Sequence, residues 1–457
     1  MMGVTMAAAA RRASRGDTLL GTRVQPGHSP PLDSIAPFFL LAPLGLVLAG
    51  LLILGTGRES FVAINANRTV AVTHALVIGW VTTFMMGACY QLGLAVLGGD
   101  LLSERTLVRV HLVLHAAAVL LFVWALATQT AAWAAVAGSI LFVSFVLFLA
   151  NILRALATAP RWSIPRAYLL ASTLFLFAAA AVGLTYALNR EFGWFATTHG
   201  RLAAHAHLGL TGWLALTIMG VSYQLVPMFN VVNTVKPRFA WPALAITIVS
   251  LVLFALVMLT DPARDVRIVL ALLLAAGPLL WALDQARLLR GRARRKMDIH
   301  GRGTAVSLSF LVLTVVLGIG AAWGTPFTSA VEPARWPLAY AIAGVGGWAG
   351  STIIANSFKI VPFLIWYHRY RPQMGKAPVP LVHDIYSEGA ASLLLAFHSA
   401  ATVVLVGAAL AGSSGWLHAG GLLIAASGVF HLGAMLWMFL PKQSSRTQQP
   451  VLRGAPM

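Results

Sequence analysis

Twelve stretches of this chain are apolar over about twenty residues or more, and this feature restricts the possible folds most strongly. A segment of that length crosses the hydrocarbon core of a bilayer as an α-helix, whereas an open sheet there would leave backbone groups unsatisfied. The chain is 59% hydrophobic and only 10% charged, which excludes an ordinary soluble protein of 457 residues. The sequence therefore predicts an all-α integral membrane protein with twelve transmembrane helices. The predicted spans cover about residues 35–55, 70–97, 108–128, 131–153, 166–188, 203–228, 240–259, 265–287, 303–323, 337–366, 387–410 and 415–440.

One motif is repeated within these spans. It reads THALVIGWVTTFMMGACYQLGLAV from Thr73, HAHLGLTGWLALTIMGVSYQLVPMF from His205, and AYAIAGVGGWAGSTIIANSFKIVPFL from Ala339. The glycines of the aligned Gly-Trp pairs, at 79, 212 and 347, are 133 and then 135 residues apart. This spacing predicts three pseudo-symmetric four-helix units within a membrane domain at 35–440. The predicted units cover about residues 35–153, 166–287 and 303–440, between disordered cytoplasmic tails at 1–34 and 441–457.

The basic residues are distributed unevenly between the two sides of the predicted membrane domain. If the N-terminus is cytoplasmic, the even-numbered loops and both tails carry 24 of the 32 Lys and Arg residues. This is the positive-inside pattern, and it predicts a bacterial-type inner membrane protein with both termini in the cytoplasm. It also explains the net charge of +19 without a nucleic-acid partner. The densest cluster, RLLRGRARRK at 287–296, is interpreted as a topology anchor, with anionic-lipid recognition as the alternative.

Histidine is the residue type that can carry chemistry here. The single cysteine, Cys89, excludes an internal disulfide and a cysteine cluster for zinc or iron–sulfur. Few carboxylates accompany the intramembrane histidines, and this imbalance favours a bound metal or haem over a proton relay. The intramembrane histidines are His74, His111, His115, His205, His207, His398, His418 and His431. The remaining ones, His28, His300, His368 and His383, are expected to be solvated, and His199 to be interfacial.

Depth separates these histidines into groups. Three of them, His74, His205 and His207, lie in the first turns of spans that begin outside, and His418 is also near the outer surface. His398 is roughly central and His431 deeper. The pair His111 and His115 lies near the cytoplasmic start of its span, too deep to share a centre with His74, and is interpreted as a pair near the inner interface. His205 and His207 are two residues apart and point about 200° apart around an α-helix, so they cannot bind one ion from the same side. Either they serve two different centres, or one is a ligand while the other makes a hydrogen bond.

The sixth span also presents small residues behind His205. Gly209, Gly212 and Gly220 continue its face, and such a stripe permits the close approach of a flat macrocycle or of a neighbouring helix. For the glycines alone, helix packing is the preferred interpretation. With a histidine at the head of the stripe, both interpretations stay open.

Together, the twelve spans, the threefold arrangement and the histidines at the outer ends of the second and sixth spans resemble catalytic subunit I of the haem–copper oxidases. The similarity covers about residues 35–440 and extends to short, divergent relatives that include the membrane haem proteins of nitric-oxide response. In the oxidases, a second-span histidine binds the low-spin haem, and His74 has this place. A sixth-span histidine binds copper there, and His205 or His207 matches it.

The chain also departs from the oxidase pattern. The seventh span, WPALAITIVSLVLFALVML, lacks the two adjacent copper-binding histidines, and the tenth span lacks the histidines that bind both haems. Thr211 stands where the oxidases have a cross-linkable tyrosine. The resemblance therefore implies an oxidase-like scaffold that does not perform the usual oxygen reduction.

The resulting hypothesis is a haem-binding membrane protein that handles electrons or a diatomic gas such as nitric oxide, with b-type haem as the expected cofactor and copper as a further candidate. An oxidoreductase activity is one version of this hypothesis. The bilayer is the expected environment, and an electron-donor protein or quinol and additional subunits are expected partners. Two alternatives are a transporter of metal, haem or another small solute, and a non-catalytic assembly or sensing subunit. The candidate ligands, in order, are His74, His207 and His205, followed by His398, His418 and His431.

Overall fold

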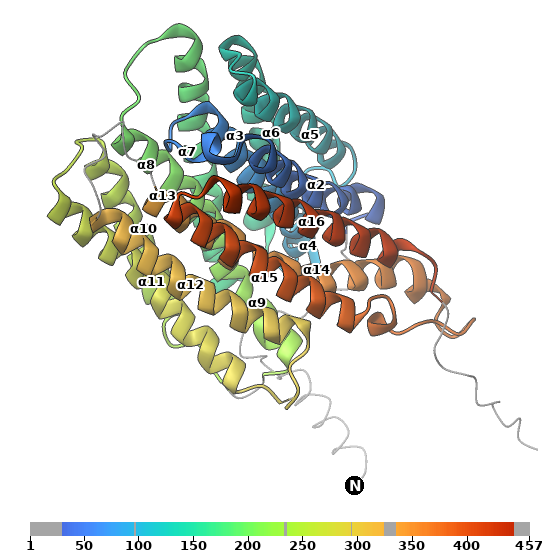
Figure 1. Cartoon of the computed structure of the whole chain (residues 1–457). Coiled ribbons are helices and arrows are strands. Elements are labelled where there is room, and N and C mark those ends of the chain that lie inside the picture. Colours follow the sequence, from blue (N-terminus) through green and yellow to red (C-terminus); the bar gives the residue numbers. More distant parts are fainter. Residues whose placement is uncertain (1–29, 96, 233–234, 294, 324–334, 443–457) are drawn as a thin grey trace, which may run out of the picture. The chain divides into compact units, whose positions relative to one another are not determined.

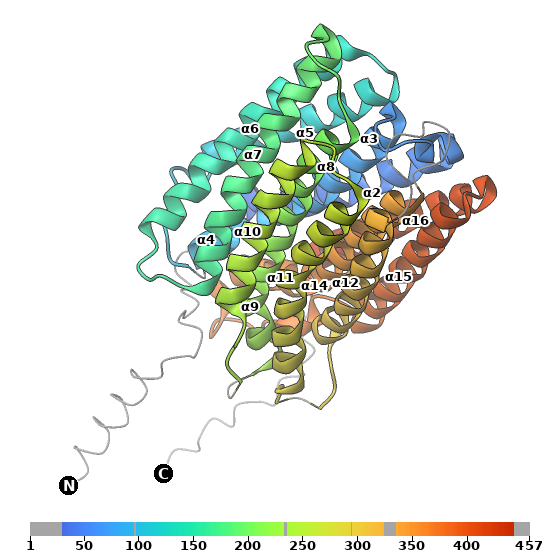
Figure 2. The same cartoon turned by 90° about the vertical axis from the view of Figure 1, so that its left-hand side faces the viewer.

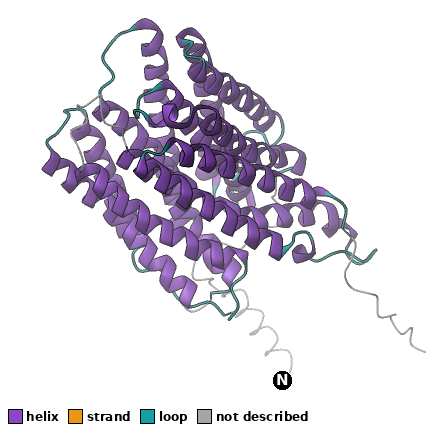
Figure 3. Cartoon of the chain, in the orientation of Figure 1, coloured by secondary structure: helices purple, strands orange, loops and turns teal. Residues whose placement is uncertain are grey.

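The structure is a computed structural model that describes residues 30–95, 97–232, 235–293, 295–323 and 335–442. The predicted tails lie almost wholly outside this part of the chain, although the first helix already begins at Leu32. Within the described residues every regular element is a helix, and none is a strand (Figure 3). Twelve helical stretches of this part are long and apolar enough to cross a membrane. The predicted all-α fold with twelve spans is thereby confirmed.

The helices group into two compact units. Among the described residues, unit 1 comprises Cys89–Ser103 and Phe142–Met297, and unit 2 comprises Pro30–Ala88, Glu104–Leu141 and the part that begins at Asp298. Residues of α4 (Thr83–Ala95) and α6 (Ala131–Thr158) belong partly to each. This division differs from the three predicted repeats, whose pseudo-symmetry remains a prediction.

The remaining elements belong to one unit each. Unit 1 contains α7 (Ile164–Phe192), α8 (His199–His207), η3 (Leu208–Ala215), α9 (Leu216–Asn230), α10 (Ala240–Met258) and α11 (Arg264–Arg290). Unit 2 contains α2 (Leu32–Thr56), η1 (Gly57–Phe61), α3 (Asn67–His74), η2 (Ala75–Thr82), α5 (Thr106–Ala127), α12 (Ile299–Trp323), α13 (Arg335–Ile342), η4 (Ala343–Ala349), α14 (Gly350–Ile365), η5 (Trp366–Tyr370), η6 (Arg371–Gln373), η7 (Val382–Asp384), α15 (Glu388–Ala411) and α16 (Ser414–Phe439).

Large apolar side chains occur on the outer faces of the helices as well as inside. Leu120 is 63% exposed, Val249 66% and Leu393 62%, although each lies in a long helix rather than in a loop. A helix that is apolar on all sides is suited to a lipid environment. These exposed residues therefore support a bilayer as the surroundings of the protein.

Glycines bring α2 and α16 of unit 2 into backbone contact, and the two helices lie side by side in Figure 1. A Cβ atom on Gly421 would lie 2.6 Å from the backbone nitrogen of Leu54 and 2.9 Å from the carbonyl oxygen of Gly50. A Cβ atom on Gly428 would lie 2.8 Å from the backbone nitrogen of Val47. Small residues allow this approach, and close packing is what holds helices together where lipid replaces water.

In unit 1, α10 and α11 are neighbours along their length (Figure 2). Gly277 of α11 faces the side chain of Thr247, and a Cβ atom at Gly277 would also lie 2.9 Å from the carbonyl oxygen of Ala243. The Thr247 hydroxyl donates to that same carbonyl at 2.7 Å, so its polar group is satisfied within its own helix. Close helix packing through glycine is therefore a property of both units.

Candidate functional site

Each copy of the repeated motif contains a π-helical segment at the same place. The segments are η2, η3 and η4, and their first residues, 75, 208 and 343, are separated by 133 and 135 positions. These are also the separations of the Gly-Trp pairs, which the segments contain. π-helical turns are rare and frequently occur at functional sites. The sequence motif therefore corresponds to a repeated local structure.

The Gly-Trp pairs have a packing role. Trp80, Trp213 and Trp348 are 0%, 1% and 6% exposed. The glycine of each pair faces the preceding span of its own unit: Gly79 faces Gly45, Gly212 faces Phe175, and Gly347 faces Phe310. The pair thus lets a neighbouring helix approach the π-helical segment closely.

His74 and His207 immediately precede the first two π-helical segments and make the same hydrogen bond. Nδ1 of His74 lies 2.7 Å from the carbonyl oxygen of Val70, and Nδ1 of His207 lies 2.8 Å from that of Ala203. Because a carbonyl oxygen only accepts, Nδ1–H is the donor in both cases and the lone pair lies on Nε2. A backbone carbonyl that fixes the tautomer in this way is typical of histidines that ligate metals.

Each of these histidines also packs against a phenylalanine one span further along the chain. The His74 ring lies edge-on to Phe122 of α5 with ring centroids 5.2 Å apart, and the His207 ring is tilted against Phe254 of α10 at 4.3 Å. Both histidines are only partly buried. Units 1 and 2 therefore each contain a half-buried imidazole with a defined tautomer beside an aromatic ring.

His205 faces a different helix from His207. Its ring packs edge-on to Tyr186 of α7 with centroids 5.5 Å apart, and it lies against Gly183 of the same helix. His207 contacts α10 instead, which confirms that the two side chains point to different sides. His205 is thus packed against α7 and is a weaker ligand candidate than His207.

The glycine stripe behind His205 also packs against α7. A Cβ atom on Gly212 would lie 2.5 Å from Cβ of Phe175, and one on Gly220 would lie 3.0 Å from the ring of Tyr168. Gly209 faces open space instead. Helix packing, rather than contact with a macrocycle, accounts for Gly212 and Gly220.

His398 and His431 are fully buried in unit 2 and belong to a hydrogen-bonded network. His398 Nε2 lies 2.8 Å from the carbonyl oxygen of Gly346 in η4, and its Nδ1 lies 2.9 Å from the hydroxyl of Ser427. His431 Nε2 lies 3.0 Å from the hydroxyl of Ser357. Both ring nitrogens of His398 are therefore engaged by the protein, which makes His398 a weaker ligand candidate than His74 or His207, and its bond to Gly346 holds the third π-helical segment.

His418 is bound to the end of a neighbouring helix. Its Nδ1 lies 2.7 Å from the carbonyl oxygen of Leu54 in the last turn of α2. Gly57 follows with φ of +50°, and a side chain there would collide with the His418 ring. A histidine near a helix C-terminus can satisfy carbonyls that have no partner within the helix. His418 accordingly caps α2.

The pair His111 and His115 is buried rather than interfacial, with exposures of 0% and 1%. His115 Nε2 lies 3.0 Å from the Thr83 hydroxyl, and that hydroxyl donates to the carbonyl oxygen of Ile78 in η2 at 2.8 Å. A buried histidine therefore supports the first π-helical segment, as His398 supports the third.

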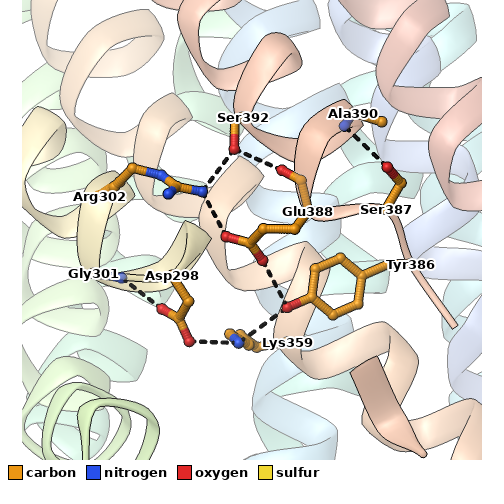
Figure 4. Close-up of polar contacts among 9 residues, drawn as sticks. All are labelled: Asp298, Gly301, Arg302, Lys359, Tyr386, Ser387, Glu388, Ala390 and Ser392. Atoms are coloured by element: carbon orange, nitrogen blue, oxygen red, sulfur yellow. Dashed lines mark hydrogen bonds and ion pairs between the residues drawn. The ribbon is translucent and has the colours of Figure 1, made fainter. Parts of the chain in front are cut away.

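A chain of charged and polar side chains joins the ends of α12, α14 and α15 (Figure 4). Lys359 Nζ lies 2.7 Å from Oδ2 of Asp298 and donates to the Tyr386 hydroxyl at 3.2 Å. Tyr386 donates to Glu388 at 3.0 Å, and Glu388 also pairs with Arg302. Every charge has an opposite partner, so this cluster has a structural role.

The same cluster explains why His300 is buried, although the sequence predicts that it is solvated. His300 is 1% exposed and not solvated. The helix α12 begins earlier than predicted, at Ile299, because Oδ1 of Asp298 accepts from the backbone nitrogen of Gly301 at 3.1 Å and caps the helix. His300 therefore lies in the first turn of α12.

The other histidines that were expected to be solvated differ among themselves. His383 is 70% exposed, as expected, whereas His368 is partly buried and His28 lies outside the described residues.

We expect the ion pair of Asp298 to make stability depend on pH. Burial raises the pKa of Asp298, but the hydrogen bond and charge of Lys359 outweigh it and hold this pKa below the ordinary value of 3.8. A depressed carboxyl pKa contributes stability that is fully present above the unfolded-state value and is lost as pH falls through the folded-state value. Asp298→Asn should therefore lower the melting temperature at pH 7 by an amount that shrinks below about pH 4.

Thermal melts of the purified protein across this pH range would test the expectation. Asp33→Asn is the matched control because Asp33 pairs with Arg109 at the surface, where both side chains are half exposed. Exposed pairs contribute about 0–1 kcal/mol. A pH-independent effect at Asp298, or an equal effect at Asp33, would contradict the expectation.

The histidines fit haem better than copper. Among the described residues, no group of three or more His, Cys, Asp or Glu side chains is arranged to hold a metal ion. An axial haem ligand requires only one imidazole with its lone pair on Nε2, and His74 and His207 meet this requirement.

The chain matches no protein-family model and no curated protein.

Proposed function

We propose that this protein is a membrane haem protein in which His74 and His207 are axial ligands of b-type haem and which handles electrons or a diatomic gas such as nitric oxide. One observation carries the proposal: the same arrangement of histidine, backbone carbonyl, π-helical segment and phenylalanine occurs once in each unit. Two sites with the same chemistry in one chain are better explained by a shared ligand than by packing alone. The resemblance to oxidase subunit I supports His74 as a haem ligand, whereas the oxidases use the sixth-span histidine for copper, so His207 rests on the repeated geometry alone.

Two kinds of protein group would influence each ligand nitrogen: a backbone carbonyl and a phenylalanine ring. The bonds from Nδ1–H to Val70 and Ala203 orient the rings and increase the basicity of Nε2. The phenylalanine rings add apolar surroundings, which limit solvent access and influence a redox potential. When bound, a b-type haem would supply a one-electron couple and an iron position for a diatomic gas.

We further infer the setting from the basic residues and the resemblance. The distribution of Lys and Arg favours a bacterial-type inner membrane with both termini in the cytoplasm. Electrons would then arrive from a separate donor protein or a quinol, with additional subunits as further partners.

Absorption spectroscopy of the purified full chain tests the proposal. We expect a Soret band that shifts on reduction, b-type haem in the pyridine haemochrome assay, and iron by elemental analysis. Protein that is folded but has no Soret band, iron or copper after expression with ample haem would contradict it. Solute uptake by such protein in vesicles would then favour the transporter, and the absence of uptake would favour an assembly or sensing subunit.

A further inference from the structure

Two basic segments of unit 1 that are far apart in the sequence meet at one corner. The segment after α9 approaches the end of α11: a Cβ atom on Gly291 would collide with the side chain of Val235. In addition, the backbone nitrogen of Ala293 donates to the carbonyl oxygen of Val231 at 3.3 Å. The contact between Val235 and Gly291 brings Lys236 and Arg290 into the same neighbourhood, because each is a direct sequence neighbour of a contacting residue.

Six cations surround this contact, and we call them the basic corner. They are Lys236, Arg238, Arg290, Arg292, Arg295 and Lys296. All are exposed except Arg292, which is half-buried and bonds the carbonyl oxygens of Leu289 and Arg295. None of the six forms an ion pair with a carboxylate in the described part of the chain. The corner therefore carries uncompensated positive charge.

Asp284, the nearby acid, does not neutralise the basic corner. It is 1% exposed, and its carboxylate accepts from the backbone nitrogens of Arg238 at 2.9 Å and Phe239 at 2.7 Å. Its remaining ionic partner is Arg287, at 3.2 Å. Asp284 thus ties the basic segment after α9 to α11 from inside while the six cations remain outside.

The corner continues into a lipid-facing apolar stripe on α11. Leu272, Leu279 and Leu283 are 50%, 37% and 54% exposed. Spacings of seven, four and seven residues place these leucines and Arg290 on one face of the helix. Trp241, 48% exposed at the start of α10, is of the kind that anchors helices at the headgroup level. Acyl chains and a headgroup can therefore be contacted by one continuous surface.

We propose that the basic corner binds the phosphates of an anionic phospholipid whose acyl chains lie along the leucine stripe of α11. The charge favours a headgroup with two phosphates, such as that of cardiolipin, over one with a single phosphate. The stripe distinguishes a lipid from a soluble anion, because a free phosphate would gain nothing from the leucines. A topology anchor alone would require basic residues on this side but not their convergence from two segments onto one apolar face.

Native mass spectrometry of the full chain in a neutral detergent tests this, with cardiolipin, phosphatidylglycerol or phosphatidylcholine added at known concentration. Removing two charges by Arg290→Gln and Arg295→Gln should weaken cardiolipin binding about 25-fold, on the order of fivefold per basic residue. Arg154→Gln and Arg161→Gln is the matched control, since both side chains are exposed in unit 1 on the same predicted side. This control should change binding less than about twofold, and both variants should melt like the parent.

Three results would overturn the proposal. Cardiolipin binding that is unchanged in the Arg290/Arg295 variant would exclude the corner as the site. Equal weakening of cardiolipin binding in the Arg154/Arg161 variant would show that binding depends only on the total positive charge of that side of the membrane. Displacement of cardiolipin by millimolar inorganic phosphate would identify a site for soluble anions instead. Because none of these readouts involves haem, they are independent of the proposed function.

Discussion

Replacing both His74 and His207 by alanine is expected to abolish the Soret band of the purified protein, and each single replacement should remove about half of it. The reason is that each histidine is proposed to supply an Nε2 ligand, and the loss of an axial ligand removes the bond that holds haem iron. Haem content per chain, measured by the pyridine haemochrome assay, would follow the same pattern. His74→Gly with added imidazole should restore part of the band, because the free base can replace the missing ligand.

His398→Ala is the informative control for this series. His398 is also an intramembrane histidine, but both of its ring nitrogens are bonded to protein groups. Its removal should lower the melting temperature and leave the haem content intact. If His398→Ala instead emptied the protein of haem while the His74 and His207 variants kept it, the ligand assignment would be wrong.

Substituting one glycine of α16 is expected to cost more stability than any surface change. In Gly421→Ala the new methyl group would lie 2.6 Å from the backbone nitrogen of Leu54 and 2.9 Å from the carbonyl oxygen of Gly50. Backbone atoms of α2 cannot rotate away as a side chain can, so the helices must separate. Overpacking of this kind costs about 1–3 kcal/mol. Unfolding in increasing SDS, followed by circular dichroism, would measure the loss.

The same helix offers a matched substitution. Gly433 also lies in α16, but a Cβ atom there meets nothing within 4 Å. Gly433→Ala should therefore be neutral or stabilise the helix by up to about 1 kcal/mol, because alanine has the higher helix propensity. Equal destabilisation by the two variants would mean that the packing of α2 on α16 is not what Gly421 provides.

The fold could be predicted well from the sequence because its cause is local. Each span depends on the hydropathy of its own twenty or so residues, so the positions of the helices follow without knowledge of their neighbours. The boundary errors have equally local causes that hydropathy ignores. The cap provided by Asp298 begins α12 at Ile299 and buries His300, whereas a polar residue at that position suggests a loop.

The candidate site was predictable only in part. The repeated motif pointed to His74 and His207, and the difference in direction between His205 and His207 follows from helical geometry. The roles of His398 and His418 depend on partners far away in the sequence, such as the carbonyl groups of Gly346 and Leu54. Hydropathy and spacing contain no information about such partners. The phenylalanines beside His74 and His207 were missed for the same reason, because each lies one span further along the chain.

The π-helical segments have a consequence for how this protein can change during evolution. A π-helical turn contains one residue more than the α-helical turn it replaces, so the helix before it is rotated by about 100° relative to the helix after it. Loss of a single residue between His74 and Thr83 would restore an ordinary helix and turn the imidazole away from Phe122. The direction of each histidine side chain therefore depends on the number of residues in the π-helical segment after it. A deletion in that segment could disrupt the site even if every side chain of the site is kept.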